Sequence, residues 1–189
     1  MSWIASLPVR KIALAALLAA GLASQAGTAG AEPPQQGDMV KFVPSAEDRT
    51  APDIPFISAA GEPIKLDSYR GKTVLVNFWA TWCPPCVKEL PSLERLNAEM
   101  GGPDFEVVLV SIDRGGARIY EPFLEKLGIA GLRSAADSKA ALMRAFKAPG
   151  LPTTYLIGPD GTVQGRLVGD AEWDSAAAKE LIKYYTSNS

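Results

Sequence analysis

The segment TVLVNFWATWCPPCVKELP, Thr73–Pro91, contains both cysteines of this 189-residue chain and its most regular hydrophobic pattern. The nearly unbroken apolar run Val74–Trp79 predicts a strand that is buried on both faces. This strand leads directly into Cys83 and Cys86, at the start of a helix-like segment. Two thiols three positions apart can close a small disulfide, and the partial positive charge at the N-terminus of the helix stabilises the first thiolate. The order strand, two thiols, helix therefore favours a reactive pair of thiols.

The composition of the chain limits the other classes of function. Its length and its 47% of hydrophobic residues suit one globular domain with short additions. The sequence contains no histidine, which excludes histidine-based copper or zinc sites and serine-histidine or cysteine-histidine nucleophile pairs. A disulfide between Cys83 and Cys86 closes a very small loop, so it restricts the unfolded chain little and is a poor structural crosslink. We therefore interpret the two cysteines as a redox-active pair.

Residues 1–31 have the pattern of a secretory signal peptide. Arg10 and Lys11 precede a 12-residue apolar run, Ile12–Ala23, and an A-x-A sequence occupies positions 29–31. The apolar run is short for a bilayer-spanning helix, so a cleaved signal is favoured over an uncleaved membrane anchor. The segment has no cysteine to which a lipid could be attached. We therefore expect export to the periplasm, where disulfides can persist.

The charge balance gives no support for nucleic acid as a partner. Cleavage after residue 31 removes two of the 19 basic residues and none of the 21 acidic ones, which leaves a net charge of −4. Residues 32–50 are rich in proline, glutamine and charge without periodicity, and we predict a linker there. The folded domain is expected to comprise residues 51–189.

The rest of the chain alternates strands and helices. We expect a short N-terminal β-hairpin from Pro55–Ser58 and Pro63–Leu66, ahead of the central strand. The other predicted elements are a helix that follows the cysteines to about Met100, helices over Arg118–Leu127, Ser138–Phe146 and Glu172–Tyr185, and strands over Phe105–Ile112, Leu132–Ala135, Thr154–Ile157 and Thr162–Val168. This order predicts an α/β fold with a central mixed β-sheet flanked by helices on both faces.

The residues around the cysteines give them different tasks in thiol-disulfide exchange. Cys83 lies ahead of the helix, with its sulfur expected to face solvent, and is the predicted attacking thiol, whereas Cys86 lies in the first turn and resolves the mixed disulfide. Pro84 and Pro85 are tolerated in the first turn, where N–H groups have no intrahelical acceptor. Neither proline can donate a hydrogen bond to the Cys83 sulfur. We therefore predict a mildly lowered pKa for Cys83 and a reducing rather than a strongly oxidising couple.

Glu89 is the candidate for proton transfer. It lies three residues after Cys86 and therefore on the same side of the helix. If burial raises its pKa toward neutrality, its carboxylate can take and return the Cys86 proton; the alternative is a solvated helix glutamate. Asn77 lies within the buried strand and needs polar partners, so we expect structural hydrogen bonds there.

Pro152 precedes a predicted strand and is a candidate cis proline. A cis bond beside the thiols directs the Leu151 backbone toward an incoming chain for strand-like pairing. The residue pattern alone favours the ordinary trans turn. Together with Trp82, which flanks the cysteines, Leu151 and Pro152 are the predicted substrate-binding residues.

An ordered set of motifs resembles the TlpA/ResA-type branch of exported thioredoxin-like proteins. The motifs are WATWCPPC, LDSYRGK before it, EVVLVSID after it, Leu-Pro-Thr at 151–153 and GDAEW near the end, and the resemblance covers about residues 51–189. It implies a thioredoxin-like fold, an attacking Cys83, a resolving Cys86, a functional Glu89 and a cis Pro152. It also places Asn77 where cytoplasmic thioredoxin has a buried aspartate, which leaves the glutamate as the candidate proton-transfer group.

The sequence therefore predicts a periplasmic thiol:disulfide oxidoreductase, expected to be a monomeric reductase. It is expected to need no metal and no cofactor other than the Cys83–Cys86 disulfide. The resemblance implies a membrane-embedded electron donor and protein substrates with disulfides, in cytochrome c maturation or in copper-site assembly of cytochrome oxidase. The alternatives are a disulfide oxidase or isomerase of the same fold, and a copper-binding assembly module that uses both thiols as soft ligands.

Overall fold

The computed structural model describes residue 1 and residues 33–46 and 49–187. Apart from residue 1, the predicted signal peptide lies outside these residues. The described strands form one sheet in the order β1-β8-β7-β4-β5-β6-β2-β3. They are β1 (Phe42–Pro44), β2 (Phe56–Ser58), β3 (Pro63–Ile64), β4 (Thr73–Trp79), β5 (Phe105–Ser111), β6 (Arg133–Ala136), β7 (Thr153–Ile157) and β8 (Val163–Val168). The α-helices are α1 (Pro84–Met100), α2 (Ala117–Leu127), α3 (Ala141–Ala145) and α4 (Ala176–Ser187), and the 3-10 helices are η1 (Gly37–Lys41) and η2 (Leu66–Tyr69).

Strand β4 is at the centre of the sheet, and all of its residues are buried. It pairs in parallel with β5 and antiparallel with β7. A strand with neighbours on both edges and cover on both faces has no solvent-facing side, which explains its continuous apolar run. A short loop joins Trp79, the last residue of β4, to the start of α1 at Pro84, so both cysteines lie at the C-terminal end of the central strand.

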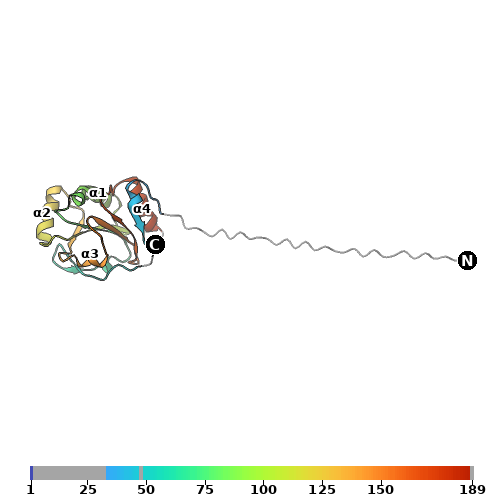
Figure 1. Cartoon of the computed structure of the whole chain (residues 1–189), viewed down its shortest axis with the longest axis horizontal. Coiled ribbons are helices and arrows are strands. Elements are labelled where there is room, and N and C mark those ends of the chain that lie inside the picture. Colours follow the sequence, from blue (N-terminus) through green and yellow to red (C-terminus); the bar gives the residue numbers. More distant parts are fainter. Residues whose placement is uncertain (2–32, 47–48, 188–189) are drawn as a thin grey trace. The chain divides into compact units, whose positions relative to one another are not determined.

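Alternate residues of β4 belong to two separate hydrophobic clusters. Leu75 and Trp79 pack with residues of α1, α2 and α4, whereas Val74, Val76 and Phe78 pack with residues of η2 and α3. Helices α1, α2 and α4 therefore cover one face of the sheet, and α3 covers the other (Figure 1). The predicted α/β fold, a mixed sheet with helices on both faces, is confirmed. No helix among the described residues is long and apolar enough to cross a membrane.

The predicted N-terminal hairpin is also confirmed. Strands β2 and β3 pair antiparallel, with Phe56 opposite Ile64, and β2 pairs antiparallel with β6. The hairpin therefore extends the sheet beyond β6.

The prediction of a linker over residues 32–50 is wrong for residues 37–44. Strand β1 pairs antiparallel with β8, with Phe42 opposite Leu167. Met39 of η1 and Phe42 are buried in the same cluster as α1 and α4. The composition of this segment is that of a linker, but two large apolar side chains and an open sheet edge are enough to fold part of it onto the domain.

Helix α3 is shorter than its hydrophobic pattern indicates. It begins at Ala141 and not at Ser138, because its N-cap residue, Ala140, has a positive φ of 50° and so cannot continue a right-handed helix. The carboxylate of Asp137 accepts hydrogen bonds from the backbone N–H groups of Ala141 and Met143. Side-chain capping of this kind satisfies the free donors at a helix start.

Helix α4 begins at Ala176 and not at Glu172. The residues before it make hydrogen bonds to α1: the backbone N–H of Trp173 donates to Ser92 Oγ at 3.1 Å. The hydrogen-bonding groups of this segment therefore bind α1 instead of forming a further helical turn.

Replacement of Phe42 by Ala tests whether residues 37–44 belong to the folded domain. Phe42 is 3% exposed and its ring lies 5.7 Å from that of Tyr185, whereas Val43, the next residue of β1, is 57% exposed. We expect F42A to lower the free energy of unfolding by about 3 kcal/mol, as measured by denaturant unfolding. The control V43A is expected to change it by less than about 0.5 kcal/mol. Equal stability of F42A and the wild type would contradict this assignment.

Candidate active site

The two cysteines form a disulfide at the N-terminus of α1. The S–S distance is 2.07 Å, and Cys83 is the N-cap residue of the helix. The backbone N–H of Cys86 donates to Cys83 Sγ at 3.4 Å. Cys83 is 5% exposed and Cys86 is fully buried. Cys83 is thus the more accessible of the two cysteines. The sequence predicts that its sulfur faces solvent, but the residue is largely buried.

The two prolines between the cysteines occupy the first turn of α1 and are exposed. Because they have no N–H group, the hydrogen bond from Cys86 is the one that reaches the Cys83 sulfur among the described residues. The local stabilisation of a Cys83 thiolate therefore rests on one N–H group and on the helix N-terminus.

The Leu151–Pro152 peptide bond is cis, as the resemblance implied. Thr153, the next residue, lies opposite Phe78 in the pairing of β7 with β4. The register therefore brings Pro152 to the end of β4 from which the cysteine loop departs. The backbone of Leu151 makes no hydrogen bond among the described residues, so its N–H and C=O groups are available to another chain.

Trp82 is 65% exposed beside the disulfide. The loop that carries it is held by the preceding residue, because Thr81 donates from its N–H and its hydroxyl to the carboxylate of Asp113, at 3.0 and 2.9 Å. A large, exposed aromatic side chain on an anchored loop is suited to contact a partner.

Glu89 is buried between α1 and the sheet, with 2% of its surface exposed. Its Oε1 accepts a hydrogen bond from Asn77 Nδ2 at 2.7 Å. Its Oε2 accepts hydrogen bonds from Trp173 Nε1 at 2.9 Å and from the Ala171 N–H at 3.2 Å. Donors from β4 and from the segment before α4 thus hold the carboxylate in place, and Glu89 is not a solvated helix residue.

Burial raises the pKa of Glu89 from 4.5 to about 7, because removal from water disfavours the charged carboxylate. The hydrogen bonds from Trp173, Asn77 and Ala171 stabilise the charged form and oppose this rise, and the nearby negative charge of Asp170 adds to it. Desolvation is the largest of these effects. A carboxyl group with a pKa near 7 can both accept and release a proton at neutral pH.

Asn77 makes structural hydrogen bonds through its side-chain nitrogen. Besides the bond to Glu89, its Nδ2 donates to Thr154 Oγ1 of β7 at 2.9 Å. Its Oδ1 has no hydrogen-bond partner among the described residues. One buried amide therefore links the central strand to both α1 and β7.

Sequence reasoning did not identify Trp173 and Ala171 as partners of Glu89. Helical spacing predicts Trp173 to be a core residue of the last helix, but its indole N–H binds the carboxylate. The available signal was the motif GDAEW. Its Gly169 directly follows β8 and has a positive φ of 93°, a conformation that glycine adopts more easily than other residues. No group of three or more His, Cys, Asp or Glu side chains suited to a metal occurs in the described part of the chain.

Comparison with known proteins agrees with this geometry. The chain matches the AhpC/TSA family over residues 48–166. It is 32% identical over 120 residues to the thiol-disulfide oxidoreductase ResA of Geobacillus kaustophilus, over 64% of this chain and 68% of that protein. It is 30% identical over 118 residues to ResA of Bacillus subtilis, over 62% and 65% of the two chains. A crystal structure from Chlorobium tepidum, provisionally assigned as the thiol:disulfide interchange protein DsbE, is 29% identical with a TM-score of 0.66, over 74% of this chain and 97% of the other.

The fold and the cysteine pair together are those of a thioredoxin-like thiol-disulfide oxidoreductase, an enzyme that exchanges its own disulfide with that of another molecule. The chain belongs to the AhpC/TSA family, and within it to the TlpA/ResA-like oxidoreductases.

Replacement of Glu89 by Gln is expected to change how stability depends on pH. The Glu89 carboxyl binds its proton more tightly in the folded chain, with a pKa of about 7, than in the unfolded chain, with a pKa of 4.5. Between these values the folded state holds more protons, so the free energy of unfolding of the oxidised protein falls as the pH rises. The titration of Glu89 is expected to lower the free energy of unfolding by about 3 kcal/mol. This fall is expected to be complete slightly above pH 7.

Denaturant unfolding at several pH values between 4 and 8 measures this dependence. We expect E89Q to lose this component of the fall, while the control E180Q, which changes an exposed glutamate of α4, keeps it. The same pH dependence in E89Q and the wild type would show that Glu89 does not titrate in this range.

Proposed function

We propose that this protein is a periplasmic reductase of protein disulfides that acts in cytochrome c maturation or in copper-site assembly of cytochrome oxidase. The observation that carries the proposal is the burial of Glu89, three residues after the resolving cysteine on α1, with its pKa raised to about 7. The resemblance to TlpA/ResA-type proteins supports the two substrate classes. In both, cysteine sulfurs of the partner must be free thiols before haem or copper can be attached.

The first step is an attack by the Cys83 thiolate on one sulfur of the substrate disulfide. An S–S bond forms between Cys83 and the substrate, the substrate S–S bond breaks, and the released substrate thiolate takes up a proton. Trp82, Leu151 and Pro152 contact the substrate in this step, and the free backbone groups of Leu151 support strand-like pairing with it.

The second step releases the substrate. The Cys86 thiol transfers its proton to the Glu89 carboxylate, and the resulting thiolate attacks Cys83 Sγ. The Cys83–Cys86 bond forms, and the second substrate sulfur leaves and takes up a proton. Two electrons pass from the cysteine pair to the substrate. The two substrate thiolates take their protons from solvent, into which Cys83 released its own proton when it ionised, and the Cys86 proton stays on Glu89 until the disulfide is reduced again.

A membrane-embedded dithiol protein then reduces the Cys83–Cys86 disulfide by the same steps in reverse, and Glu89 returns its proton to Cys86. The signal-like pattern of residues 1–31 supports export, with a cleaved leader preferred over a retained membrane anchor. The protein acts as a monomer, with the disulfide as its redox group and without a metal.

A C86S variant tests the proposal, because it can carry out the first step but not the second. Expressed with its own leader in an exporting bacterial host, it is expected to accumulate a protein partner linked to Cys83 through a disulfide. Non-reducing electrophoresis and mass spectrometry of the complex identify the partner.

The matched variant C83S is expected to capture no partner, because Cys86 is fully buried. Capture by neither variant, or equal capture by both, would contradict the assigned order of attack.

A further inference from the structure

A groove of about 790 Å³ lies beside the disulfide on the side of α2 and α3. Its large apolar side chains are those of Trp82, Ile112 and Ile119, and Trp82 and Ile119 are 65% and 48% exposed. The groove adjoins the redox motif directly, because the Ile112 N–H donates to Trp79 O at 3.0 Å and Asp113 binds Thr81. Its volume is within the range of pockets that bind ligands.

Three cationic side chains line the same groove: Arg114, Lys139 and Arg144. All three residues are exposed, and none of them forms an ion pair with a described residue. The Arg144 guanidinium donates to the Lys139 carbonyl, which fixes its position on α3.

The single acidic side chain that lines the groove is Asp113, which is buried with 3% of its surface exposed. Its two oxygens accept hydrogen bonds from Thr81 and from the Ser111 hydroxyl. The nearest acidic residues of α2 along the chain, Glu121 and Glu125, do not line the groove. The surface beside the disulfide is therefore positive, although the whole chain has a net charge of −2.

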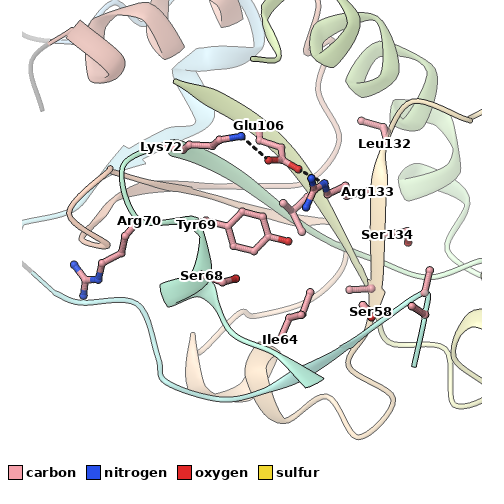
Figure 2. Close-up of a pocket in the computed structure, with 14 residues that line it drawn as sticks. Ser58, Ile64, Ser68, Tyr69, Arg70, Lys72, Glu106, Leu132, Arg133 and Ser134 are labelled. Atoms are coloured by element: carbon pink, nitrogen blue, oxygen red, sulfur yellow. Dashed lines mark hydrogen bonds and ion pairs between the residues drawn. The ribbon is translucent and has the colours of Figure 1, made fainter. Parts of the chain in front are cut away.

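A second cavity, of about 590 Å³, provides a contrast (Figure 2). Three cations line it: Arg70, which pairs with Asp67, and Lys72 and Arg133, which both point to the same carboxylate. Lys72 Nζ lies 3.1 Å from Glu106 Oε2, and Arg133 Nε lies 2.8 Å from Glu106 Oε1. These cations are already neutralised in part, whereas those of the groove beside the disulfide are not.

We propose that the groove beside the disulfide binds an acidic segment of the protein whose disulfide is reduced. This proposal rests on the proposed function and adds the chemical class of the substrate. An apolar side chain of the partner packs on Trp82, Ile112 and Ile119, and carboxylates next to its reactive cysteine face Arg114 and Lys139. Opposite charges at the edge of an interface speed up correct encounters more than they strengthen the complex, so the effect belongs to the rate of the first step.

The test uses two synthetic hexapeptides as disulfide-linked dimers. Each contains one cysteine and one phenylalanine; one peptide has two aspartates beside the cysteine and the other has two lysines. The reduced wild-type protein is expected to reduce the acidic dimer about tenfold faster than the basic one at low ionic strength, as measured by stopped-flow tryptophan fluorescence. The ratio is expected to approach one at about 1 M salt, where exposed charges are screened.

Charge-reversal variants test whether Arg114 and Lys139 cause the preference for the acidic peptide. The double variant R114E/K139E is expected to reverse the preference between the two peptides. The matched double variant K126E/K183E makes the same change in net charge at two exposed lysines outside the groove, and it is expected to keep the wild-type preference. Arg144 is left unchanged because it holds the backbone of Lys139.

An uncharged substrate, hydroxyethyl disulfide, separates the two proposals. If the wild type reduces it but shows no preference between the peptides, or if R114E/K139E prefers the acidic peptide as strongly as the wild type, the groove proposal is overturned and the reductase remains. If the wild type does not reduce it or either peptide, the reductase function fails and the groove proposal fails with it. Salt dependence in the wild type tests the groove even if a double variant does not fold.

Discussion

The burial of the Glu89 carboxylate is the constraint on which the rest of this structure depends. A carboxylate removed from water is unstable unless polar groups surround it. Here the backbone and side chains of β4 and of the segment before α4 supply three donors, from Asn77, Ala171 and Trp173. They offset part of the desolvation, and the remainder appears as the raised pKa. A fold that only needed stability would place an apolar residue here, so the buried glutamate supports the proposed proton chemistry.

This constraint also explains features that are far from Glu89 in the sequence. Trp173 lies 84 positions further along the chain, and its bonds to Glu89 and to Ser92 fix the segment before α4 against α1. The same helix carries the cysteines at its N-terminus. The proposed proton acceptor and the sulfurs therefore share one helix, while the proposed recognition surfaces, Leu151–Pro152 and the groove beside Trp82, come from other parts of the chain, including α2 and α3. The chemistry and the choice of partner can thus change independently.

The features of the fold and site that could be predicted from the sequence are those that depend on residues close together in the chain. The buried strand β4, the cysteine pair, the hairpin β2–β3 and the helix-side position of Glu89 all follow from local spacing. The cis bond at Pro152 came from the resemblance, because an X-Pro pair alone does not fix its isomer. Strand β1 and the indole donor of Trp173 were missed because each depends on contact with a distant segment, β8 or α1. The charges of the groove were missed for the same reason, since Arg114 and Lys139 come from separate loops.

The central claim is that Glu89 titrates near neutral pH. The most direct test is a carbon NMR titration of the protein labelled at the glutamate side-chain carboxyl carbon, with the Glu89 signal assigned by comparison with E89Q. A midpoint at about pH 7 is predicted for Glu89 in the oxidised protein. A midpoint near 4.5, the ordinary value for a glutamate, would contradict the account, because the carboxyl would then be ionised throughout the pH range in which it is proposed to exchange a proton with Cys86.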